Sequence, residues 1–172
     1  GWVDLLFSKG VARAWFLLGR LAGALALFVF SLAVIGGIPA LLLWLRAGVG
    51  PGRFLGALGL LVFSFTVLLA LMALVAALEP NPAVPIMAAF VQTVLSVSLA
   101  NRKGMYAIIT AKWAQWLIDW AYRILPKNDE LIRLARTYLR GGTIDWWPVW
   151  SSALFLAGAL ALALWLLHRK SF

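Results

Sequence analysis

Residues 21–45 read LAGALALFVFSLAVIGGIPALLLWL, a run that contains no charged residue. An α-helix rises about 1.5 Å per residue, so this run reaches roughly 37 Å and can cross the ~30 Å apolar core of a bilayer with some tilt. Gly36, Gly37 and Pro39 lie in its second half, where a kink or a close helix contact is expected. The run therefore predicts a membrane-spanning helix.

Three further runs follow the same pattern, over residues 54–78, 83–100 and 148–167. The last is preceded by Trp146, Trp147 and Trp150 and followed by His168-Arg169-Lys170, an aromatic girdle and a basic stop that are typical of a span. The whole chain is 64% hydrophobic and 12% charged, against about 45–50% and about 25% in soluble domains. We predict an all-α integral membrane protein, one transmembrane domain over residues 1–172 with four transmembrane helices.

The third run is the most polar of the four. Gln92 and Ser96 are four residues apart, so they share one face of the predicted helix. Hydrogen bonding between helices is the usual role of such side chains in a membrane. A polar surface that faces a transported substrate is the alternative interpretation.

Residues 101–146 form the one long stretch that we expect outside the hydrocarbon. Within residues 105–140 the pattern predicts a pair of amphipathic helices. Pro126 ends the first, Asn128 offers an N-cap for the second, and Gly141-Gly142 ends it.

An aromatic face on the first of these two helices is expected to lie in the headgroup region. A stacking platform for a ligand is the less common use of such a face. The tryptophans assigned to the interface are Trp113, Trp116, Trp120, Trp146 and Trp147.

A short basic stretch precedes the first span. Residues 5–20 read LLFSKGVARAWFLLGR, and residues 2–18 are expected to form an amphipathic segment on the membrane surface. The formal charge of +9 is spread over the ends of apolar runs and a mixed-charge segment. Lipid headgroups are therefore the expected counterions, and no nucleic-acid partner is predicted.

The side chains that carry most enzyme chemistry are scarce in this sequence. The chain has no cysteine, one histidine (His168), no carboxylate within a predicted span and no P-loop pattern. We predict no catalytic residue, no metal site and no cofactor bound by this chain. A membrane enzyme that acts on lipid would need a cluster of His, Asp and Glu at one interface.

The order of these elements resembles the C-terminal two-thirds of the permease subunit of bacterial ABC type 2 transporters. That family has a Leu-x-x-x-Pro-Val-Ser-Arg pattern before its third span, to which Leu6 and Gly10-Val11-Ala12-Arg13 correspond. A Leu-Leu-Gly-Lys-like entry into the third span follows in the family, and here it reads Leu17-Leu18-Gly19-Arg20. Its last span ends in an aromatic residue, arginines and an acid, at the position of residues 168–172. Gly10, Ala12 and Ser171 stand where the family has Pro, Ser and the acid.

The resemblance implies a non-enzymatic permease subunit of an ATP-driven exporter, present here as the C-terminal part of a longer permease. It implies two partners besides the bilayer: a separate ATP-binding subunit, which holds ATP and Mg²⁺, and a second permease subunit in a homo- or heterodimer. The coupling element would dock on the ATP-binding subunit, with Lys9 and Arg13 pairing with its acidic groups. Its residues are Ser8, Lys9, Gly10, Val11, Ala12 and Arg13.

Charge and resemblance disagree about orientation. Four spans place both termini on one side, with five basic residues there and ten on the other, so the positive-inside rule favours termini outside. The resemblance implies a bacterial or archaeal cell membrane with cytoplasmic termini, and we adopt it. The alternative function is a structural or assembly membrane protein whose Trp-rich segment contacts lipid or a partner.

Overall fold

The computed structural model describes residues 13–47, 51–79 and 81–169, and these contain helices and connections without a strand. Four of the helices are long and apolar enough to cross a membrane. Their bounds are Arg13–Ala47 (α2), Pro51–Leu78 (α3), Ala83–Ala100 (α4) and Trp147–Arg169 (α8). The four predicted spans are thus confirmed, and the protein is an all-α membrane protein.

Helix α2 is longer than its predicted span. It begins at Arg13 and continues through Pro39, which lies inside the helix, to Ala47. Residues 13–18 of the predicted surface segment are therefore the first turns of α2, while residues 2–12 lie outside the described residues. The rings of Phe28 and Phe65 stack with centroids 3.9 Å apart and join α2 to α3.

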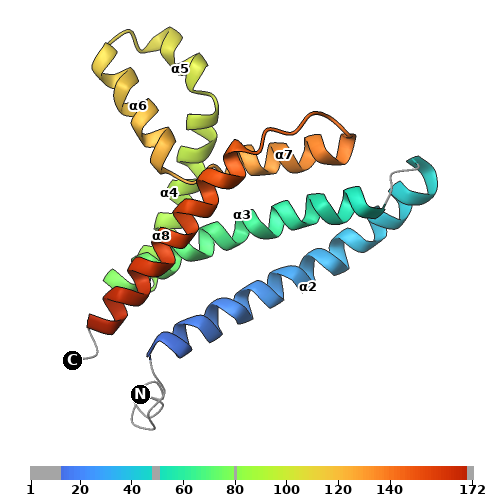
Figure 1. Cartoon of the computed structure of the whole chain (residues 1–172), viewed down its shortest axis with the longest axis horizontal. Coiled ribbons are helices and arrows are strands. Elements are labelled where there is room, and N and C mark those ends of the chain that lie inside the picture. Colours follow the sequence, from blue (N-terminus) through green and yellow to red (C-terminus); the bar gives the residue numbers. More distant parts are fainter. Residues whose placement is uncertain (1–12, 48–50, 80, 170–172) are drawn as a thin grey trace.

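Helix α3 lies at the centre of the molecule and packs against α2, α4, α8 and the shorter helix α7, Asn128–Arg140 (Figure 1). Small residues line its buried positions, with Ala70, Ala73 and Ala77 between 1% and 4% exposed and Val67 fully buried. Small side chains let helix backbones approach closely, which is how helices associate where lipid gives no hydrophobic driving force.

Three helices, rather than the predicted pair, connect α4 to α8. They are α5 (Arg102–Ile108), α6 (Lys112–Ile124) and α7. Figure 1 shows α5 and α6 folded into a hairpin that projects away from the long helices, whereas α7 lies along α3. Gly141, with φ +76°, ends α7 in the left-handed conformation, as the predicted stop at Gly141-Gly142 requires.

Helix α7 packs against the long helices through its apolar face. Leu131, Leu134 and Ala135 recur at helical spacing and are at most 7% exposed, because they pack against the long helices. Close approach to α3 occurs at Gly56, where an added Cβ would stand 2.3 Å from Cε1 of Tyr138. The apolar face of α7 is therefore a protein contact.

Candidate functional site

The predicted coupling residues fall at the edge of the described structure. Ser8, Lys9, Gly10, Val11 and Ala12 lie outside the described residues, and Arg13 is the first residue of α2. Because α2 is continuous from Arg13, the Leu17-Leu18-Gly19-Arg20 part of the resemblance belongs to the same helix as the first span.

Gln92 and Ser96, the predicted polar face of the third span, both contact residues 125–130, the junction between α6 and α7. Gln92 is 3% exposed, and its Nε2 donates to the carbonyl oxygen of Pro126 at 2.9 Å. The Oγ of Ser96, a residue 4% exposed, accepts the backbone N–H of Asp129 at 2.9 Å. The hydrogen bonds that we expected between helices thus run from α4 to this junction.

The junction is also bonded to the last span. The Oγ of Ser152, a fully buried residue in the second turn of α8, accepts the backbone N–H of Lys127 at 3.2 Å. Ser96 and Gln92 lie one and two turns before the end of α4. The junction therefore inserts between α4 and α8, inward of the ends of both helices.

The predicted N-cap at Asn128 is wrong. The helix begins at Asn128 itself, its N-cap position is Lys127, and no side chain of the N-cap residue bonds to the helix. The first backbone N–H groups of a helix lack partners within it. Here Ser96 and Ser152 accept N–H groups of Asp129 and Lys127 from other helices, so the acceptors come from distant parts of the sequence.

The side chain of Asn128 therefore does not cap the helix. It is 3% exposed, and neither its amide nitrogen nor its oxygen has a hydrogen-bond partner among the described residues. Asp129 and Glu130 occupy the first turn of α7, where negative charge stabilises the positive end of the helix.

Lys127 brings a positive charge into this junction. The residue is 3% exposed, and its Nζ donates to Oγ of Ser151. The amine lies 4.6 Å from the ring centroid of Tyr122 and 5.7 Å from that of Trp147, within the range of a cation–π contact. Burial lowers the pKa of Lys127 below its usual value.

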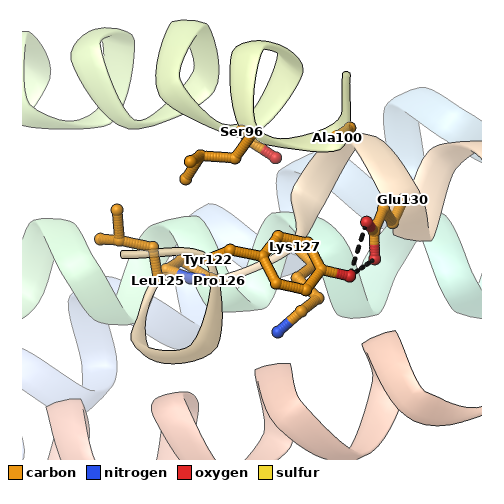
Figure 2. A pocket seen from close by; sticks show the side chains of 8 residues that line it. Ser96, Ala100, Tyr122, Leu125, Pro126, Lys127 and Glu130 are labelled. Carbon is orange, nitrogen blue, oxygen red and sulfur yellow. Dashed lines mark hydrogen bonds between the residues drawn. The ribbon is translucent and has the colours of Figure 1, made fainter. Parts of the chain in front are cut away.

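Tyr122 joins the junction to the α5–α6 hairpin. Its hydroxyl donates to the carboxylate of Glu130 at 2.8 and 2.9 Å (Figure 2), and the guanidinium of Arg102 lies 3.5 Å from its ring centroid. Burial, followed by the bond to Glu130, raises the pKa of Tyr122. The hairpin is closed by Asp119, which accepts a hydrogen bond from Tyr106 and lies 3.8 Å from Nε of Arg102.

A small cavity separates Tyr122 and the junction from α4. Its volume of about 10 Å³ is close to what one water molecule needs. Figure 2 shows the polar side chains around it. The lining residues are Ser96, Leu99, Ala100, Tyr122, Leu125, Pro126, Lys127 and Glu130.

The tryptophans that we assigned to the interface are exposed. Trp113, Trp116 and Trp120 are 73%, 64% and 55% exposed along one face of α6, and the rings of Trp116 and Trp120 stack at 6.3 Å. Trp146 and Trp147, at the start of α8, are also about half exposed. This aromatic surface is free to contact lipid or another protein.

The part of the site that α8 supplies was not predicted from the sequence. Ser151 and Ser152 are the polar pair of the last span, and Lys127 follows the proline that separates two amphipathic helices. A polar pair in an otherwise apolar span is a signal for a buried contact, but nothing in the sequence specifies its partner. No group of three metal-ligating side chains forms within the described part of the chain.

Comparisons with known proteins add nothing to these contacts. No family model, no curated protein and no solved structure matches the chain.

Proposed function

We propose that the protein is the membrane-spanning permease subunit of an ATP-binding-cassette exporter in a bacterial or archaeal cell membrane. ATP and Mg²⁺ bind to a separate subunit, and the chain itself carries out no chemical step. Movement of the ATP-binding subunits is passed through residues 8–13 to the spans.

The observation that supports this proposal best is the continuity of α2. The basic stretch that resembles a coupling element leads at Arg13 into a single helix that runs 35 residues to Ala47. A continuous helix transmits movement along its axis, so a displacement at the first turn of α2 is carried into the membrane.

The exposed apolar surface of α2 supports a permease subunit that forms a dimer. Residues 17–46 of α2 are apolar except for Arg20 and Arg46 near the two ends, and none of the most hydrophobic part is buried against the other described residues. In the proposed exporter this surface faces lipid or the second permease subunit, and termini are cytoplasmic. The junction attaches residues 101–146 to α4 and α8, so the outer segment moves with the spans.

The test is copurification with the ATP-binding subunit. The tagged chain is expressed with its genomic neighbours, and the purified complex is assayed for ATP hydrolysis. Arg13→Glu reverses a charge in the proposed docking segment and should abolish copurification. The matched control is Arg46→Glu at the opposite end of α2, which should leave copurification unchanged. A wild-type chain that purifies without any ATP-hydrolysing subunit contradicts the proposal.

The second candidate is a structural or assembly protein of the membrane. It is favoured by the aromatic face of α6, where Trp113, Trp116 and Trp120 remain exposed. Replacing these three residues with serine should then abolish the biological activity while leaving any ATPase copurification unchanged. If the protein is an exporter, Arg13→Glu should instead reduce its activity more than the three tryptophan replacements do.

A further inference from the structure

A second, larger cavity lies between α6 and α8. It is open to the surroundings and has a volume of about 480 Å³. Its lining residues are Arg123, Ile124, Trp147, Ser151, Leu154 and Phe155. We call this cavity the α6–α8 groove.

The groove follows one face of the last span. Trp147, Ser151 and Phe155 are each four residues apart, so they follow one another along α8. The distance from the first to the last is about 12 Å along the helix axis. Since α8 enters the membrane at its tryptophan girdle, the groove runs from headgroup level into the hydrocarbon.

Polarity changes along the groove. Arg123 and Ser151 supply a guanidinium and a hydroxyl, whereas Ile124, Leu154 and Phe155 are apolar. Leu154 is 76% exposed, although it belongs to a span. A ligand that matches this surface has a polar headgroup at one end and a hydrocarbon chain at the other.

The polar end has an uncompensated positive charge. Arg123 is exposed and forms no ion pair or hydrogen bond with the described residues. No carboxylate lines the groove. The hydroxyl oxygen of Ser151 also accepts a hydrogen bond from the amine of Lys127. A guanidinium and a hydroxyl that line one groove favour an anion, and guanidinium groups bind phosphate oxygens in pairs.

We propose that the α6–α8 groove binds one phospholipid of the surrounding bilayer. The lipid phosphate contacts Arg123 and Ser151, and one acyl chain lies over Leu154 and Phe155. The site is independent of the proposed transport function, because it requires neither the ATP-binding subunit nor a second permease subunit.

Native mass spectrometry of the delipidated full chain, titrated with palmitoyl-oleoyl phosphatidylglycerol in detergent, measures the binding directly. We expect one tightly held lipid per chain. Arg123→Gln should weaken its binding about tenfold or more, since it removes a charged hydrogen-bond donor. The control is Arg136→Gln, an exposed arginine on α7 outside the groove, which should change the affinity less than about twofold.

Two further measurements separate a phospholipid from a free anion. Leu154→Trp fills the apolar end without touching the charges, and it should also weaken lipid binding about tenfold. Inorganic phosphate should not displace the lipid. The proposal is overturned if both arginine variants behave alike, if Leu154→Trp binds lipid normally, or if inorganic phosphate competes with the same affinity.

Discussion

Single hydroxyl groups hold the junction in place. The bond from the backbone N–H of Lys127 to Ser152 is buried and that from Asp129 to Ser96 is partly buried. An unpaired buried N–H costs about 1–3 kcal/mol. A sequence does not reveal these bonds, because serine in a span usually bonds to its own helix, as Ser98 does to Val94. Gln92 and Ser96 could be placed on one face from their spacing alone. The segment that they contact, residues 125–130, could not be predicted from the sequence.

We predict that Ser152→Ala lowers the free energy of unfolding by about 1–3 kcal/mol, since it leaves the N–H of Lys127 without an acceptor. Ser98→Ala removes a hydroxyl that bonds only within its helix and should change the free energy by less than about 0.5 kcal/mol. Tryptophan fluorescence during denaturant unfolding in detergent measures both. Equal effects of the two variants would show that the Ser152 contact contributes nothing.

At the scale of elements, the sequence predicted α6 and α7 better than it predicted their surroundings. Pro126 and Gly141 mark two of their ends, and both signals are local. The apolar face of α7 has the same period whether it meets lipid headgroups or another helix. Its docking on α3 depends on Gly56, whose missing side chain makes room for Tyr138, and such complementarity between distant residues has no local signal.

Gly56→Ala should therefore separate α7 from α3. The new Cβ would stand 2.3 Å from Cε1 of Tyr138, and relieving such overpacking costs about 1–3 kcal/mol. Gly59→Ala is the matched control, because a Cβ there meets nothing within 4 Å. The variant is compared with wild type by thermal unfolding, and adding Tyr138→Ala should restore much of the loss. A double variant that is no more stable than Gly56→Ala contradicts this contact.

For the whole molecule, hydropathy predicts the four spans because each span must be apolar along its own length, whatever its neighbours are. Orientation is different, since it depends on charges at both surfaces, and here ten basic residues oppose five. Within the described residues, three of the ten interact with other side chains: Arg102 with Tyr122 and Asp119, Lys127 with Ser151, and Arg133 with Asp129. The remaining seven still exceed five, so the charge count continues to favour termini outside, against the orientation that the resemblance implies.

Cysteine labelling in intact cells tests this orientation, because residues 1–172 contain no cysteine. Thr143→Cys lies in the exposed connection before α8, and Glu79→Cys lies in the exposed turn between α3 and α4. A charged maleimide cannot cross the apolar core. It should therefore label position 143 in intact cells and position 79 only after permeabilisation. The reverse pattern would place residues 8–13 outside the cell, where no ATP-binding subunit can dock, and would contradict the exporter proposal.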